Sequence, residues 1–294
     1  MSSCAKFAPI KVGKNKTGCT ISSLGSLDIP SIGATQYSGL QQKIEGYNVA
    51  DLAFGTANAK TITISFWIKS TVTGQYTFCL LNSDDSRVCP LGYTISASNT
   101  WEYKTVTVSG CTDGTWDTTN GAGLRIIFWG ALGSNYSGGT SGTWTSTGSI
   151  KYGVSSPVNA LNANGNIFAI TGVQLEVGSV ATPFERRLYG QELALCQRYF
   201  QSWSQANSQV IWAAAYWSAA GQNMPVQICY PVTMRSSPTA TQVGTWTVSN
   251  ISSATWNGYF AGTQSATMYW PANAAGYTYI VSPASGGLTL AAEL

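Results

Sequence analysis

The sequence contains no histidine and very little charge. Its 294 residues include 15 Lys and Arg and 12 Asp and Glu, so that 9% of the chain is charged, whereas about a quarter is usual for a soluble domain. Without histidine the chain cannot form a Ser-His-Asp or Cys-His nucleophilic site, and it lacks the commonest metal ligand. The glycine-rich run at 138–148 contains neither Lys nor Arg and leads into no helix. A phosphate-binding loop is therefore excluded as well.

Long apolar runs and basic stripes are also missing. No segment reaches the roughly 20 apolar residues of a membrane-spanning helix, and the N-terminus lacks the apolar core of a signal peptide. The net charge is +3, and the only loose basic cluster is Lys6, Lys11, Lys14 and Lys16. Because no basic stripe accompanies the aromatic residues, we expect no nucleic-acid partner. We also expect no membrane insertion, and synthesis in a host cytoplasm.

The seven cysteines are odd in number and include no C-x-x-C pair. Free thiols are the ordinary state for such a chain. Cys79 and Cys89 flank a predicted hairpin loop, so a disulfide between these two remains open.

Carboxylates are the remaining means of catalysis, because glycosidases use two acids that flank the scissile bond. The candidates are Asp84, Asp85, Asp113, Asp117 and Glu102. The four aspartates lie in turn-like sequence, where aspartate is favoured for local hydrogen bonds to the backbone. The same acids, or Asp51, offer oxygen ligands to calcium, but nothing resembles a complete coordination loop. We expect structural roles and no cofactor, with calcium left as an alternative.

The sequence is rich in strand-forming patterns and in aromatic residues. Hydrophobic residues make up 44% of the chain, with 11 Trp and 15 Tyr. Residues 60–70 alternate cleanly, which places Ile62, Ile64, Phe66 and Ile68 on one face and Trp67 among polar residues on the other. Residues 74–95 indicate a hairpin, and 124–132 form an apolar run of the length of a buried strand. We predict an all-β protein with a jelly-roll or β-sandwich domain, a short connecting helix and a second, smaller β-sandwich domain.

The organisation follows from changes of pattern along the chain. We expect an N-terminal arm or attachment segment at 1–35, the jelly roll at 36–184, a helix at 185–200 and a C-terminal β domain at 201–294. That last domain has almost no charge after Arg235, and an exposed surface of this kind would aggregate. Burial between subunits is the better explanation, so the domain is predicted to serve trimerisation or to form a receptor-binding tip.

Aromatic residues in such excess also provide stacking surfaces for sugars or partner proteins. The loop at 133–148 combines Gly, Ser and Thr with two aromatic residues. The candidate glycan-binding residues are Trp116, Trp129, Tyr136, Trp144 and Tyr152. For these residues, packing within the fold and subunit contact remain the alternatives.

One stretch, ITGVQLEVGSVATPFERRLYGQELALCQRYF at 170–200, resembles a motif of bacteriophage tail-fibre and minor structural proteins that have a carbohydrate-binding-like jelly roll. The blocks at 42–82, 99–110, 114–129 and 230–239 are similar to the same family, in the expected order. The resemblance does not extend to 1–35, where an Asp-Arg-Trp-like strand is absent. It implies that VQLEV and ATPFE hold the fold together, with Pro183 and Phe184 closing the sandwich.

We therefore interpret the chain as a fibre-like, non-enzymatic virion protein of a bacteriophage. It would form a homotrimer, contact other virion proteins and adhere to host-surface glycan. One alternative is a capsid decoration or head-fibre protein with a purely structural role. A polysaccharide-degrading tailspike acting through Asp113 or Asp117 is a further alternative, but the long repetitive β-helix of such enzymes is absent.

Overall fold

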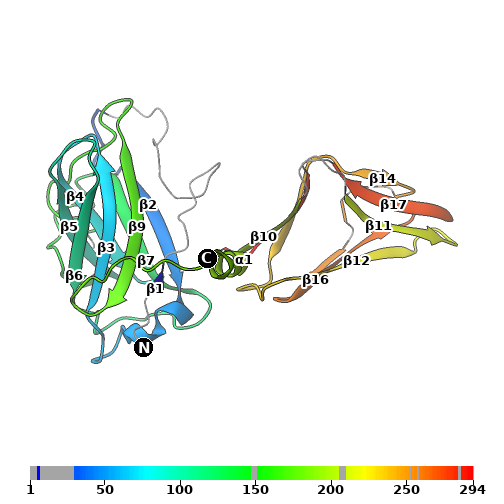
Figure 1. The fold of residues 1–294 in the computed structure, drawn as a ribbon, viewed down its shortest axis with the longest axis horizontal. Helices are drawn as coiled ribbons and strands as arrows, with labels where there is room; N and C mark the ends of the chain where they lie inside the picture. Colours follow the sequence, from blue (N-terminus) through cyan, green and yellow to red (C-terminus); the bar gives the residue numbers. More distant parts are fainter. Residues whose placement is uncertain are drawn as a thin grey trace. The chain divides into compact units, whose positions relative to one another are not determined.

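The chain is nearly all β in the computed structural model, with one α-helix among the described residues (Figure 1). The structure describes residues 5–6, 30–146, 151–204, 210–251, 253, 255–256, 258–283 and 286–293. Most of the predicted N-terminal arm lies outside these residues, including three of its lysines, Cys4 and Cys19. The chain divides into two compact units between Arg186 and Arg187.

The first unit is a jelly-roll β-sandwich of two antiparallel sheets. The four-stranded sheet contains, in spatial order, β1 (Ala5–Lys6), β9 (Phe168–Val177), β3 (Ile62–Ser70) and β6 (Glu102–Val108). The five-stranded sheet contains β2 (Tyr37–Glu45), β7 (Ala122–Leu132), β4 (Gly74–Leu81), β5 (Arg87–Ile95) and β8 (Thr145–Ser146). Two short 3-10 helices, Gly46–Asn48 and Ala50–Leu52, follow β2.

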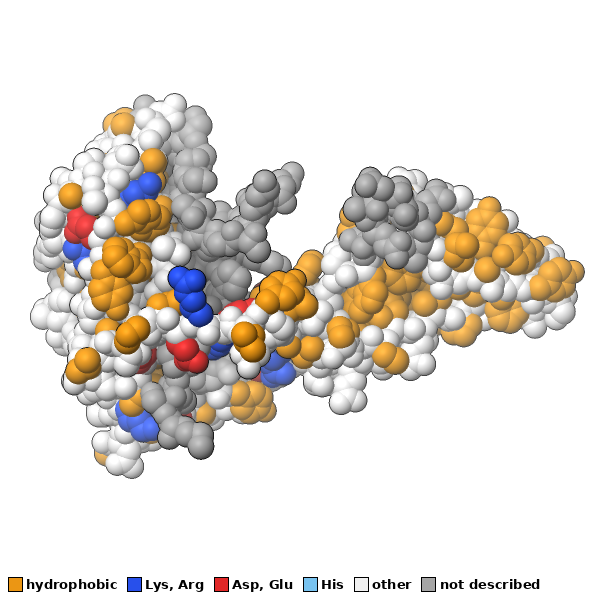
Figure 2. Space-filling model, in the orientation of Figure 1, with side chains coloured by type: hydrophobic (Ala, Val, Ile, Leu, Met, Phe, Trp, Pro, Cys, Tyr) orange, Lys and Arg blue, Asp and Glu red, His pale blue; other side chains and the backbone are white. Residues whose placement is uncertain are grey.

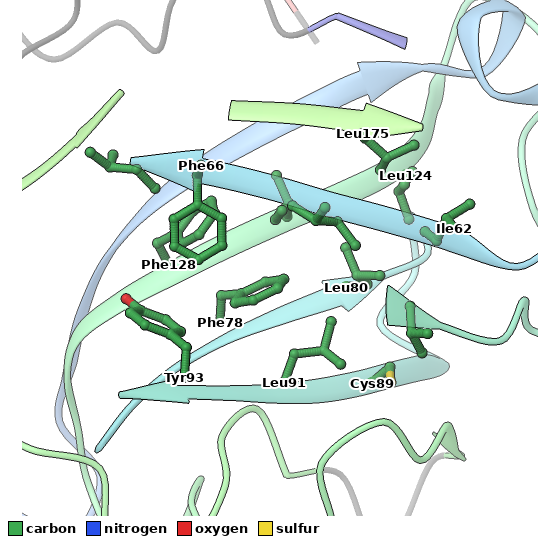
Figure 3. Close-up of a cluster of buried hydrophobic side chains, with 14 of the residues drawn as sticks. Ile62, Phe66, Phe78, Leu80, Cys89, Leu91, Tyr93, Leu124, Phe128 and Leu175 are labelled. Carbon is green, nitrogen blue, oxygen red and sulfur yellow. The ribbon is translucent and has the colours of Figure 1, made fainter. Parts of the chain in front are cut away.

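Phe66 lies at the centre of the core between the two sheets (Figure 3). Its ring centroid is 5.6 Å from that of Phe78, 5.2 Å from that of Tyr93 and 5.0 Å from that of Phe128. All three contacts are edge-to-face, the geometry that aromatic quadrupoles prefer. Since Phe66 belongs to β3 and its partners to the other sheet, these contacts join the two layers.

The strand pattern predicted from the sequence is confirmed in this unit. The four predicted inward residues of β3 are completely buried, and the hairpin of β4 and β5 turns at residues 82–86.

The possible disulfide between Cys79 and Cys89 is wrong. Cys89 is in register with Leu80 and Cys79 with Pro90. Neighbouring residues of a strand face opposite sides of the sheet, so the two thiols are separated by the sheet and both are free.

The second unit begins with the helix α1 (Tyr189–Gln197), which is shorter than the predicted segment 185–200. Glu192 lies in its first turn, as expected, and pairs with Arg187 at 3.4 Å. None of the helical residues is buried. The apolar side chains Leu188, Tyr189, Leu193 and Leu195 are exposed on and just before the helix.

The rest of the second unit forms three three-stranded antiparallel sheets. They are β10 (Phe200–Ser204), β18 (Gly287–Ala291) and β13 (Thr239–Val243); β11 (Val210–Trp217), β17 (Gly276–Ser282) and β14 (Thr247–Ser249); and β12 (Asn223–Cys229), β16 (Ser265–Pro271) and β15 (Gly258–Ala261).

These three sheets are successive stretches of one ribbon. The central strands of the three sheets are β16, β17 and β18 in chain order. Along one edge, β12, β11 and β10 pair with them in turn, and along the other edge β15, β14 and β13 do so. Both edges are therefore antiparallel to the central strands. The register is almost continuous, because Phe200 pairs with Ala291 and Asn223 still pairs with Pro271. Trp270, Met268, Ile280 and Leu288 come from the central strands and meet in one core. A single long ribbon thus folds at two corners around its own apolar face.

We predict that Phe66→Ala lowers the free energy of unfolding by about 3–5 kcal/mol, because it leaves a large cavity in the core. Trp67→Ala, one residue further along the same strand, removes only a half-exposed cross-strand contact and is expected to cost about 1 kcal/mol or less. Denaturant unfolding of the full chain measures both values. Equal losses in the two variants would contradict the register of β3, since a one-residue slip exchanges the two faces.

Candidate functional site

The five aromatic candidates from the sequence gather into two separate clusters of the first unit. In the first, called here the Phe54 cluster, Trp116 and Trp144 lie with ring centroids 5.5 Å apart, and 4.9 and 5.7 Å from that of Phe54. In the second, the Trp129 cluster, the other three candidates meet with Tyr37. Its members are Tyr37, Trp129, Tyr136 and Tyr152.

Hydrogen bonds within the fold occupy the polar atoms of these tryptophans. Each indole N–H donates to a backbone carbonyl: Trp116 to Asp113 at 3.0 Å, Trp144 to Ser109 at 2.8 Å and Trp129 to Tyr152 at 3.1 Å. In the Phe54 cluster the ring edges of Trp116 and Trp144 also contact neighbouring aromatic rings. The two clusters therefore have the geometry of packing aromatics.

The Gly/Ser/Thr loop that carries Tyr136 and Trp144 is fastened to the free edge of β5. The Gly142 N–H donates to the Pro90 carbonyl at 2.9 Å, and the Gly92 N–H donates to Ser141 Oγ at 3.0 Å. Further on, Thr145 pairs with Val88 as part of β8. An edge strand presents unpaired backbone groups that invite aggregation. This loop covers the edge of β5, which is a structural role. Residues 147–150 lie outside the described part of the chain.

Four of the five candidate acids have lowered pKa values. Arg87 binds both carboxylate oxygens of Asp113, at 2.7 and 2.9 Å, and thereby lowers the pKa of that carboxyl. Hydrogen bonds from Thr119 lower the pKa of Asp117, and the bond from Lys104 lowers that of Glu102. Asp84 follows the same trend through Ser86, in the turn predicted for it. A general acid needs a raised pKa, so none of these four carboxylates has the property of one.

The first unit contains a small cavity near the candidate residues. A depression beside Trp116 and Asp117, between the 3-10 helices and the start of β7, offers about 10 Å³ to the centre of a water molecule, which is room for one water. Among the described residues, no three Cys, Asp or Glu side chains gather where they would hold a metal ion. The calcium alternative stays a prediction, because calcium also binds backbone and amide oxygens. Likewise, no helix of the described segments is long and apolar enough to cross a bilayer.

A different aromatic group lies on the outer face of the four-stranded sheet. Trp67 of β3 is in register with Tyr103 of β6; each side chain is 44% exposed, and the ring centroids are 5.4 Å apart. Phe184, 51% exposed, lies near Trp67 across Gly172, because a Cβ placed on this glycine would be 3.5 Å from Trp67 and 4.0 Å from Phe184. We call these three residues the Trp67 platform.

Sequence reasoning missed the Trp67 platform, although a signal for it was present. The alternation of residues 60–70 already places Trp67 on the polar face. A large aromatic residue on the solvent side of a strand is more informative than one on the core side. Its proximity to Tyr103 and Phe184 depends on strand pairing and on the fold of residues 178–186, which the sequence pattern does not reveal.

The polar residues of VQLEV position Phe184. The side-chain amide of Gln174 accepts from the Glu185 N–H at 3.0 Å, and Glu176 accepts from both the backbone N–H and the hydroxyl of Thr182. These bonds fold the segment after β9 back over the outer face of the sheet. We call Gln174, Glu176 and Thr182 the clasp. Phe184 was expected to close the sandwich, but it lies on the outer face and is half exposed. The reason is that the clasp turns the chain outward after β9.

Comparison with known proteins finds only weak likeness. No family model and no curated protein matches the chain. One solved structure is a cycloisomaltooligosaccharide glucanotransferase from Paenibacillus sp. complexed with cycloisomaltoheptaose, at 8% identity and TM-score 0.21, covering 94% of this chain and 46% of that one. Another is cucumber necrosis virus, at 11% identity and TM-score 0.16, covering 97% and 91%. This chain thus spans about half the length of the glucanotransferase, and at such TM-scores neither likeness supports an argument.

We predict that Thr182→Val destabilises the first unit by about 1 kcal/mol at neutral pH, because it removes a part-buried hydrogen bond from the hydroxyl of an exposed threonine to the Glu176 carboxylate. Burial opposes ionisation of Glu176, but bonds from Gln174 and Thr182 outweigh it and hold its pKa below the usual 4.5. A lowered pKa gives stability that is fully present above that usual value and is lost as the pH falls through the folded-state value.

The wild type should therefore lose stability between about pH 5 and pH 3, and the variant should lose less over that range. Unfolding free energies at a series of pH values measure both slopes. Thr94→Val, at an exposed threonine of β5, is the matched control. Identical slopes in wild type and Thr182→Val would contradict the clasp.

Proposed function

We propose that this protein is a fibre-like structural component of a bacteriophage virion that adheres to host-surface glycan through its first unit, without catalysis. The observation that carries adhesion is a β-sandwich that exposes large aromatic side chains: Tyr37, Tyr47, Trp67, Tyr103 and Phe184. Figure 2 shows hydrophobic side chains on one face of the first unit, with charged side chains beside some of them. Exposed aromatic rings stack on the C–H faces of sugars, and hydroxyl and amide groups bond to sugar hydroxyls. Attribution to a phage rests on the sequence blocks that resemble tail-fibre proteins.

Self-association is part of this proposal. Between residues 199 and 292 the only charged residue is Arg235, and its guanidinium bonds to the Ala292 and Glu293 carbonyls. The outer faces of the ribbon carry exposed apolar residues: Ile211, Tyr216, Val243, Phe260 and Tyr277. Exposed apolar surface without charge mixed into it marks an interaction surface. A second and third copy of the chain would cover it.

We expect the purified chain to sediment as a trimer in solution. The apolar exterior of the second unit makes association favourable by the hydrophobic effect. Analytical ultracentrifugation over a range of concentrations gives the mass. A mass equal to one chain at all concentrations would contradict the trimer, whereas loss of association in Tyr216→Ser/Tyr277→Ser would support the second unit as its location.

The adhesion is tested by binding fluorescently labelled protein to candidate host cells, with unlabelled protein as competitor. We expect saturable, competed binding without release of reducing ends from the cell-surface polysaccharide. Asp113→Asn and Asp117→Asn should leave the binding unchanged, because both carboxylates are engaged within the fold.

Two results would overturn this function. Reducing ends that appear with the wild type and vanish with either Asn variant would indicate a tailspike-like hydrolase. Absence of competed binding to an authenticated host would favour a capsid decoration or head-fibre role instead.

A further inference from the structure

Trp67 occupies an unusual position in an otherwise enclosed strand. Eight of the nine residues of β3 are buried or half-buried, and Trp67 is the exposed one. Its neighbours on the same face, Thr63 and Ser65, are buried by the returning segment 178–186, with Thr63 bonded to the Gly178 carbonyl at 2.7 Å. That segment leaves Trp67 uncovered. The fold therefore holds a large aromatic ring rigidly at the surface, where its apolar area contributes little to stability.

The residues around the ring supply what a sugar needs. Tyr103 and Thr171 flank Trp67 in the two neighbouring strands, and both are exposed. Thr105, also exposed, follows Tyr103 on the same face. Their hydroxyl groups can both donate and accept hydrogen bonds, as sugar hydroxyls do.

Within β3 and β6, Lys69 is the one charged residue that faces this side of the sheet. Lys69, the next outward residue of β3, lies with its ammonium 5.5 Å from the centroid of the Trp101 ring, which occupies it in a cation–π contact. Glu102 and Lys104 pair with each other at 2.6 Å and alternate with Tyr103, so they belong to the opposite side of β6. An uncharged ligand is favoured over an ionic one.

Phe184 completes the platform. The positive φ of Gly172, +60°, and the bulge beside it bring Trp67 and Phe184 to either side of a residue that has no side chain. Three rings from three separate segments thus border one surface. The clasp of Gln174, Glu176 and Thr182 keeps the third ring in place, so the platform is formed before any ligand arrives, which reduces the entropy lost on binding.

The geometry points to the Trp67 platform, and not to the loop aromatics, as the glycan-binding site. Trp67 stacks on the C–H face of a neutral hexopyranose such as glucose or galactose, and Tyr103, whose ring is tilted by 48° to that of Trp67, contacts the edge of the same sugar. Phe184 borders this sugar, and Thr105 and Thr171 bond to its hydroxyls. This inference rests on the proposed function, for which it names the site and the ligand class. The loop tryptophans are unsuitable because their N–H groups and ring edges are engaged within the fold.

The test is binding of the full-length protein to immobilised glucan and galactan oligosaccharides. Trp67→Thr and Tyr103→Thr place a strand-compatible residue at each position, so the sheet should remain intact. We expect each variant to bind at least about tenfold more weakly, as truncation of a central aromatic contact does. Tyr103→Phe keeps the ring and should retain most of the affinity.

Tyr47→Ala is the control, because Tyr47 is an exposed aromatic residue of the first unit that lies on a 3-10 helix outside this sheet. Thermal unfolding and sedimentation of each variant accompany the binding assay. Wild-type binding that persists in Trp67→Thr/Tyr103→Thr would overturn the site but leave the proposed function standing. Absence of binding by the wild type to any of the sugars would overturn the ligand class; if host cells still bind the protein, the adhesion itself survives. A change of oligomeric mass in Trp67→Thr would make this face a subunit contact and overturn the site.

Discussion

Phe66 sets the arrangement of the first unit. Its ring meets Phe78 and Phe128 of the opposite sheet at edge-to-face distances, so the two layers can approach only with this residue directed inward. Strand alternation then directs Trp67 outward, with no further interaction required. The aromatic contacts of Phe66 and the exposed position of Trp67 in β3 are thus consequences of the same register. A site built on such a strand is more rigid than one built on a loop.

The motif VQLEV-ATPFE gains a physical meaning from this arrangement. Leu175 is buried in the core, while Gln174 and Glu176 on the other face bind the chain as it returns. Buried carboxylates and amides are tolerated only with full hydrogen bonding, and the backbone and hydroxyl of Thr182 supply much of it. One alternating strand therefore closes the core with its apolar residues and fixes the exit of the chain, together with Phe184, with its polar residues.

In the second unit a continuous three-stranded ribbon replaces the two-layer plan. Its corners depend on residues that allow close approach of the strands. A Cβ on Gly244 or Gly286 would lie within 2.6 Å of Pro283, and the ring of Tyr269 covers the space that a side chain at Gly258 would fill. This unit has almost no charge, and the trimer proposed above would cover its exposed apolar residues.

Local pattern alone determined much of this protein. The alternation of β3, the hairpin at 82–86, the buried run of β7 and the single short helix follow from periods of two and 3.6 residues and from turn-forming aspartates. Tertiary structure decided the rest. Trp116 joins Trp144, and Trp129 joins Tyr152, through contacts that no spacing encodes. The separation of Cys79 from Cys89 depends on a one-residue register. Trp67 lies near Phe184 only because a clasp over one hundred residues away along the chain folds back across the sheet. Long-range pairing of this kind leaves no periodic trace in the sequence.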